Sequence, residues 1–185
     1  MDGTSNRGKR FAQQVHRRLG TLEVEDQLAA VRYLRSLPFV DGDRIGVHGW
    51  SYGGYMTLNL MLRAPEVFVC GVSGAPVTDW AQYETGYTER YMDTPVENPR
   101  GYAESSCVAR AAALRGRLLV VQGPDDRTVM LSHTIAFVDA CIDAGVLLDY
   151  LPYPMQQHGV RGTDRRHLLR TMTRFFAEHL LASKG

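Results

Sequence analysis

The sequence contains few cysteines. Cys70, Cys107 and Cys141 are odd in number and far apart, and none belongs to a CxxC pair. This excludes a disulfide framework and a zinc knuckle, both of which need closely paired cysteines. We therefore expect all three to be buried as small apolar side chains.

Net charge and long apolar runs are also missing. The formal charge is +1 over 185 residues, which gives no field that would attract nucleic acid or an anionic membrane. No stretch of about 18 apolar residues could form a membrane span. Residues 1–10 are polar with no apolar run behind them, so no signal peptide is visible and the compartment is left open. We expect a soluble protein that binds neither nucleic acid nor membrane.

The residues that are present predict one soluble domain over 1–185. The composition, 44% hydrophobic and 22% charged, suits a chain that buries a sizeable core. Short apolar runs of strand length alternate with helical periodicity. The predicted strands are 45–50, 67–72, 118–121 and 146–151. The predicted helices are 21–37, one that starts immediately after Ser51 and runs to residue 63, 132–144 and 164–181.

This alternation predicts an α/β fold. Strands that are apolar on both faces indicate a parallel sheet with helices on each side. In the helix at 132–144 we expect Ile135, Val138 and Ile142 to share one face, with Gly145 just past the end. Residues 75–101 follow no single period and are rich in proline and aromatics, which predicts an irregular insert with one or two short helices.

A G-x-S-x-G pattern, Gly49-Trp-Ser-Tyr-Gly53, lies between a predicted strand and a predicted helix. This is the setting of the nucleophile elbow of α/β-hydrolases. A serine hydroxyl becomes nucleophilic when a strained turn exposes it and a base takes its proton. Ser51 is therefore the candidate nucleophile, and the amide of Tyr52 is the candidate oxyanion donor at the helix N-terminus.

An acid and a histidine follow in the order that this fold requires. Asp125 and Asp126 both come after the strand at 118–121, and His158 comes after the strand at 146–151. We prefer Asp126 as the acid because it has the G-x-x-D-x-x-V spacing usual for this turn, which leaves Asp125 as a turn residue. The acid would orient the histidine, and the histidine would take and return the proton.

The other five histidines lie in a basic segment, within a strand or on helices, and none has a short ligand spacing with a carboxylate. No metal site and no cofactor are expected. These five residues are His16, His48, His133, His167 and His179.

The chain resembles the catalytic domain of the prolyl oligopeptidase family, and most closely its dipeptidyl peptidase IV branch. The segments that carry this resemblance cover nearly the whole chain: 17–27 (RRLGTLEVEDQ), 49–55 (GWSYGGY), 75–80 (APVTDW), 87–92 (YTERYM) and 158–162 (HGVRG). The resemblance implies a serine peptidase with the triad Ser51, Asp126 and His158. It also implies that the 75–101 insert builds a pocket for a proline-sized ring, from positions matching Tyr52, Val77, Trp80, Tyr83, Tyr87 and Val129.

The sequence departs from the family in three places. Thr128 stands where members usually have Asn or Arg as a ligand for a substrate carbonyl, and Pro124 lies in the acid turn. The family also has several strands before the region of Arg17, with an oxyanion-hole tyrosine among them, and a propeller domain before those. We therefore expect a longer parent protein that contains a propeller, and the first strands of the fold to be missing from this chain.

These features predict a peptidase that works through an acyl-enzyme and releases N-terminal dipeptides after proline or alanine. Two alternatives stay open. One is a general esterase or acylaminoacyl peptidase with the same triad, and the other is a truncated, non-catalytic module that acts through interactions. The expected partner is a peptide substrate, and the sequence leaves a homodimer open.

Overall fold

The computed structural model describes residues 6–181, which divide into two compact units. Unit 1 contains the described residues up to Gly42 together with Asp79–Ser106, and unit 2 contains Asp43–Thr78 and the described residues from Cys107 onward. That 1–185 form one catalytic domain stays a prediction.

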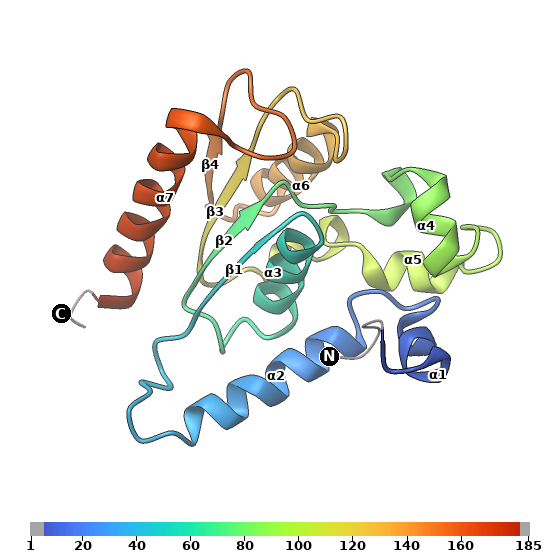
Figure 1. Cartoon of the computed structure of the whole chain (residues 1–185), viewed down its shortest axis with the longest axis horizontal. Helices are drawn as coiled ribbons and strands as arrows, with labels where there is room; N and C mark the ends of the chain where they lie inside the picture. Colours follow the sequence, from blue (N-terminus) through green and yellow to red (C-terminus); the bar gives the residue numbers. More distant parts are fainter. Residues whose placement is uncertain (1–5, 182–185) are drawn as a thin grey trace. The chain divides into compact units, whose positions relative to one another are not determined.

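Unit 2 is built around a parallel four-stranded sheet in the order β1-β2-β3-β4 (Figure 1). Its strands are β1 (Gly46–Trp50), β2 (Cys70–Gly74), β3 (Arg117–Gln122) and β4 (Asp149–Pro152). β2 and β3 are buried along almost their whole length, as apolar strands covered on both faces should be. The predicted α/β-hydrolase class, with its parallel sheet, is confirmed.

Two strands begin three residues later than predicted. β2 starts at Cys70 rather than at residue 67, because Val67 still closes the turn after the preceding helix through its bond to the Ala64 carbonyl. β4 starts at Asp149 rather than at residue 146. The amides of Gly145 and Val146 bond back to the carbonyls of Ile142 and Cys141, in the two-bond pattern that ends many helices, so both residues belong to a helix cap.

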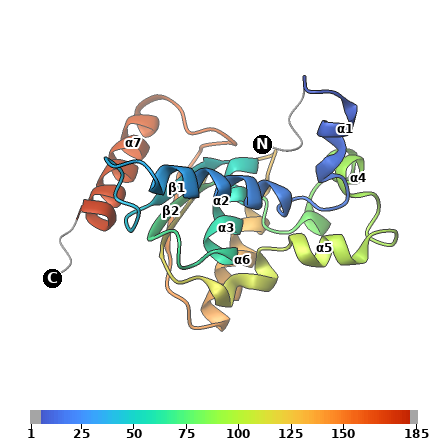
Figure 2. The ribbon, with the colours of Figure 1, turned by 90° about the horizontal axis from the view of Figure 1, so that it is seen from below.

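Helices cover both faces of the sheet in unit 2. Figures 1 and 2 show α3 (Tyr52–Arg63) and α6 (Leu131–Asp143) on one face and α7 (Gly162–Phe176) on the other. α7 continues as a turn of π-helix at Ala177–Leu181, and a 3₁₀ helix, η3 (Val108–Ala113), leads into β3. α3 begins directly after Ser51, as predicted.

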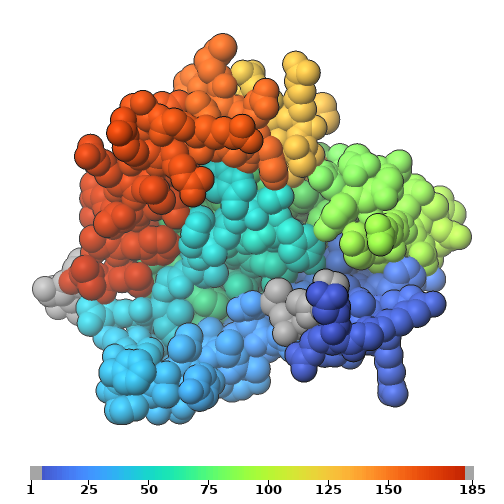
Figure 3. Space-filling model, in the orientation of Figure 1, coloured from blue at the N-terminus to red at the C-terminus, as the bar shows by residue number. Residues whose placement is uncertain are grey.

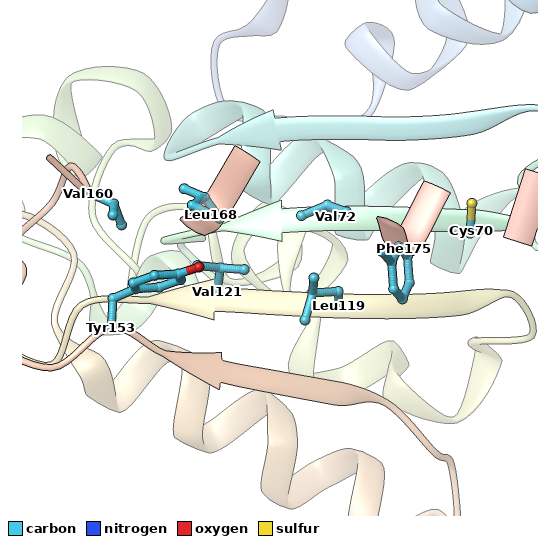
Figure 4. Packing of buried hydrophobic residues seen from close by; sticks show 8 residues of the cluster. All are labelled: Cys70, Val72, Leu119, Val121, Tyr153, Val160, Leu168 and Phe175. Atoms are coloured by element: carbon cyan, nitrogen blue, oxygen red, sulfur yellow. The ribbon is translucent and has the colours of Figure 1, made fainter. Parts of the chain in front are cut away.

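The core beneath α7 is a compact apolar cluster drawn from both the sheet and the helix. Figure 4 shows side chains of β2 and β3 meeting Leu168 and Phe175 of α7. The burial of Leu168 and Phe175 agrees with the predicted closing helix. The cluster comprises Cys70, Val72, Leu119, Val121, Tyr153, Val160, Leu168 and Phe175.

The predicted apolar face of the helix at 132–144 is wrong. Ile135 and Ile142 are exposed at 47% and 66%. The buried residues of α6 are instead His133, Thr134, Phe137 and Cys141. The helix carries apolar residues on two sides, and the buried side is the one where the Thr78 hydroxyl donates to the His133 carbonyl at 2.7 Å.

Unit 1 consists of short helices. They are α1 (Lys9–Ala12), the 3₁₀ helices η1 (Gln13–Val15) and η2 (Trp80–Gln82), α2 (Leu22–Arg35), α4 (Thr85–Met92) and α5 (Pro99–Ser105). α2 confirms the predicted helix, although it ends two residues earlier. The irregular insert has the two short helices expected for it. The amide of Arg17 donates to the Tyr91 carbonyl at 2.7 Å, and the Asn98 side chain donates to the Arg17 carbonyl at 2.9 Å, which fixes the segment before α2 against α4 and α5.

The three cysteines are buried and form no disulfide, as predicted. Burial raises the pKa of the Cys70 and Cys141 thiols to about 11 in each case, so both stay protonated and act as apolar side chains at neutral pH. Between residues 6 and 181 no helix is both long and apolar enough to cross a bilayer.

Candidate active site

Ser51 lies on a sharp turn between β1 and α3. Its backbone has φ 59° and ψ −119°, a conformation that non-glycine residues rarely adopt. The Ser51 amide donates to the Gly74 carbonyl at 2.8 Å, and the Ser51 carbonyl accepts from the Tyr55 amide at 3.0 Å. The sheet on one side and the helix on the other thus hold the strained residue in place.

The two glycines of the elbow have different roles. A Cβ on Gly49 would lie 2.1 Å from the carbonyl oxygen of Gly53, so the strand and the first turn of α3 approach too closely for any side chain there. A Cβ on Gly53 would meet no atom within 4 Å. Close packing at the elbow therefore requires a glycine at position 49 but not at position 53.

This difference predicts opposite effects of two matched substitutions. Gly49→Ala should cost about 3 kcal/mol or more, because the clash is with backbone that cannot move aside. The Tm should then fall by roughly 6–12 °C. Gly53→Ala should stabilise α3 by about 0.5–1 kcal/mol. Thermal unfolding followed by circular dichroism would measure both, and equal losses in the two variants would contradict this account of the elbow.

Asp126 lies in the turn after β3 and is 5% exposed. Its Oδ1 accepts hydrogen bonds from the amides of Thr128 and Val129, both at 2.9 Å. Its Oδ2 lies 2.8 Å from Nδ1 of His158. Asp125, the alternative acid, is exposed, and its amide donates to the Gln156 carbonyl at 3.2 Å. Of the two adjacent carboxylates, Asp126 is therefore the one that contacts the histidine.

His158 bridges the acid and the serine. Its Nε2 lies 2.9 Å from the Ser51 hydroxyl oxygen, while its Nδ1 faces Asp126. Three residues that are far apart in the sequence thus form one hydrogen-bonded chain at the carboxyl ends of β1, β3 and β4. In the space-filling view, the cyan elbow region lies directly beside the orange segment that follows β4 (Figure 3). This arrangement can move a proton from the serine to the imidazole while the carboxylate stabilises the resulting cation.

Two further residues, which no sequence motif indicated, hold the histidine loop and the acid turn in position. The indole Nε1 of Trp50 donates to the His158 carbonyl at 2.6 Å. The side-chain nitrogen of Gln122, a residue at the end of β3, donates to the Val129 carbonyl at 2.6 Å and so closes the acid turn. Trp50 lies inside the elbow motif, but neither bond is visible as a sequence pattern, since both link positions brought together only by folding.

Of the predicted substrate residues of unit 2, Tyr52 lies at the elbow and Val129 at the acid turn, whereas Val77 follows β2. Tyr52 is the first residue of α3, which places its amide at the positive end of the helix dipole. Val77 and Val129 are buried at 2% and 0%. The main chain of Val129, rather than its side chain, makes the bonds that shape the acid turn.

The predicted substrate residues of unit 1 form an aromatic cluster. Trp80 stacks on Tyr87 with ring centroids 5.7 Å apart, and Tyr83 meets both rings edge-on. Tyr91, which the prediction did not include, lies 4.9 Å from Tyr87. Burial, followed by the nearby Tyr91, Tyr83 and Glu23, raises the pKa of Tyr87 to about 12, so its hydroxyl stays protonated at neutral pH. Within the cluster Trp80 is buried, and Tyr83 and Tyr87 are half-buried.

The other histidines have partners away from the triad. His16 pairs with Asp93 at 3.2 Å, His48 lies 3.1 Å from the Val72 carbonyl, and His167 lies 2.8 Å from the Tyr153 hydroxyl. Within residues 6–181 no group of three acidic, histidine or cysteine side chains could hold a metal ion.

The pattern that defines the prolyl oligopeptidase family matches residues 1–183. The chain belongs to this family. It is 38% identical over 163 residues to human dipeptidyl peptidase 8, a match that covers 86% of this chain and 18% of the relative. It is also 36% identical over 181 residues to venom dipeptidyl peptidase 4 of Vespula vulgaris, which covers 95% of this chain and 23% of the relative.

Solved structures of the same family agree with the fold. A chain from Bacteroides ovatus, 50% identical, superposes with a TM-score of 0.95 over 97% of this chain and 25% of its own length. Dipeptidyl peptidase 4 of Porphyromonas gingivalis, 40% identical, superposes with a TM-score of 0.93 over 97% of this chain and 26% of its own length. The chain thus spans about a quarter or less of the relatives it matches. The predicted place near the dipeptidyl peptidase IV branch is confirmed.

Proposed function

We propose that this chain is the catalytic part of a serine peptidase of dipeptidyl peptidase type. The hydrogen-bonded chain from Ser51 through His158 to Asp126 is the observation that supports this most strongly. The names of the relatives, dipeptidyl peptidases 4 and 8, support the proposal that the peptidase is of dipeptidyl peptidase type.

In the first half of the reaction, the Ser51 oxygen attacks the substrate carbonyl carbon. The hydroxyl proton passes to His158 Nε2, and Asp126 stabilises the imidazolium. The Tyr52 amide donates to the negative oxygen that forms. His158 then protonates the leaving amine, and the C–N bond breaks to leave an ester on Ser51. In the second half, water attacks this ester while His158 takes a proton from it. The bond between the carbonyl carbon and the Ser51 oxygen then breaks, His158 returns the proton to that oxygen, and the acid product leaves.

The proposed substrate preference is for a small or proline residue before the scissile bond. Its support is the family resemblance, in which the positions matching Trp80, Tyr83 and Tyr87 wrap a proline-sized ring; flat aromatic rings suit a compact pyrrolidine better than a long side chain. The requirement for a free amino terminus, a propeller domain in the parent and a homodimer stay proposals that rest on the family resemblance.

A comparison of three substrates tests the proposal. We expect the chain to cleave glycyl-prolyl anilide with a kcat/KM at least about tenfold above that for glycyl-leucyl anilide, a difference of about 1.4 kcal/mol. A short-chain nitrophenyl ester reports the triad alone. Ester cleavage without any cleavage of the proline amide would favour the esterase alternative, and cleavage of neither would favour the non-catalytic one.

A further inference from the structure

The loop that carries His158 is closed by the side chain of Gln156. Its Oε1 accepts a hydrogen bond from the Arg161 amide at 2.9 Å, and its Nε2 donates to Oδ2 of Asp164 at 2.8 Å. Arg161 caps the N-terminus of α7, and Asp164 lies in the first turn of that helix. The Gln156 side chain therefore bonds to the helix cap five positions further along the chain, and His158 lies within the loop that this contact closes.

The main chain of Gln156 is held as well. Its amide donates to the Tyr153 carbonyl, and its carbonyl accepts from the Asp125 amide, both at 3.2 Å. The acid turn packs so closely here that a Cβ on Gly123 would lie 2.1 Å from the Gln156 carbonyl oxygen. Gln156 thus touches the acid turn, the end of β4 and the start of α7, the three segments whose relative placement fixes the contact between His158 and Asp126.

The chemistry of the site suits a neutral amide. Helix caps commonly use a side chain in the first turn to accept from the cap amide. Here Asp164, the acidic residue of that turn, instead accepts from Gln156, and Gln156 accepts from the cap amide. A carboxamide offers the acceptor and the donor that this relay requires, whereas a carboxylate would face Asp164 with like charge.

We propose that Gln156 is a positioning residue that holds His158 in line between Asp126 and Ser51. The inference rests on the proposed function for its effect on rate, although the geometry it describes can be measured without activity. Gln156 does not touch the reacting atoms. Its effect passes through the loop, since a displacement of about 1 Å in a reacting group can cost about a hundredfold in rate.

The neighbouring residue gives a matched control. Gln157 has the same side chain and lies closer to His158, but it is exposed, and no side-chain hydrogen bond joins it to another described residue. Gln156→Leu should slow ester hydrolysis and fluorophosphonate labelling by about a hundredfold. Gln157→Leu should leave both within about twofold. Equal rates in the two variants would overturn the proposal.

A reciprocal exchange tests the bond itself. Gln156→Glu places a second carboxylate beside Asp164 and should slow labelling about as much as Gln156→Leu does. Adding Asp164→Asn reverses donor and acceptor across the same contact, so the double variant should recover to within about threefold of the parent rate. A general loss of loop stability would not be repaired by a second substitution, and failure of the double variant to recover would contradict the proposal.

A readout that does not depend on activity separates this inference from the proposed function. If the parent chain is labelled no faster than Ser51→Ala, the proposed function fails, and NMR then decides the role of Gln156. We expect the Arg161 amide to exchange with solvent at least about tenfold faster in Gln156→Leu than in the parent or in Gln157→Leu. We also expect the signal of the His158 Nδ1 proton to be lost only in Gln156→Leu. Unchanged exchange and an unchanged His158 signal would overturn the inference.

Discussion

Replacing Ser51 by alanine is expected to lower the rate of hydrolysis by about a million-fold, to the residual rate that remains without a nucleophile. The reason is geometric, because the Ser51 oxygen is the only group of the triad that can form the acyl bond, and it lies 2.9 Å from His158 Nε2. The variant should fold normally, since the amide and carbonyl of residue 51 make the bonds that hold the elbow. Progress curves with a nitrophenyl ester would measure the loss.

The control for this variant is a serine outside the triad. Ser73 is also in the sheet of unit 2 and is fully buried, with its hydroxyl donating to the Gly54 carbonyl at 2.9 Å. Ser73→Ala should keep a rate within about tenfold of the parent while losing about 1 kcal/mol of stability from the missing hydrogen bond. Ser51→Ala activity within tenfold of the parent would remove Ser51 as the nucleophile.

Asp126→Asn is expected to lower the rate by about ten-thousand-fold. The two amides of Thr128 and Val129 that bond to Oδ1 require an acceptor at that atom, so the oxygen of the new carboxamide must face them. Its NH₂ group then points at His158 Nδ1 and forces the imidazole proton onto Nε2. In that tautomer His158 cannot accept the proton of Ser51.

The adjacent carboxylate is the control for this second prediction. Asp125→Asn should change the rate by less than about twofold, because that side chain is exposed and only its main-chain amide joins the histidine loop. The comparison uses the same substitution at neighbouring positions, which separates the role of the acid from general damage to the turn. A larger loss in Asp125→Asn than in Asp126→Asn would reverse the assignment of the acid.

The sequence predicts the parts of the fold that depend on local patterns. Short motifs predict the elbow at Ser51, the acid after β3 and the histidine after β4. In each motif a reactive side chain and a glycine occur close to the end of a strand. The parallel sheet follows from strands apolar on both faces. Each of these signals lies within about ten residues, so it can be seen before the chain is folded.

The sequence could not predict features that depend on which surfaces meet. α6 carries apolar residues on two sides, and Phe137 rather than Ile135 faces the sheet, although either side fits the helical period. The start of β4 depends on a helix cap that extends to Val146. Gln122 and Gln156 show no motif, because their partners are seven, five and eight residues away along turns whose shape is set by packing.

The most direct test of the triad is to map where a fluorophosphonate reacts. This account predicts one phosphonyl group per chain, found by mass spectrometry on the peptide that contains Ser51, with labelling reduced at least about a thousandfold in His158→Ala because the serine then has no base. Labelling on a different residue, or labelling of Ser51 that persists unchanged in His158→Ala, would contradict it.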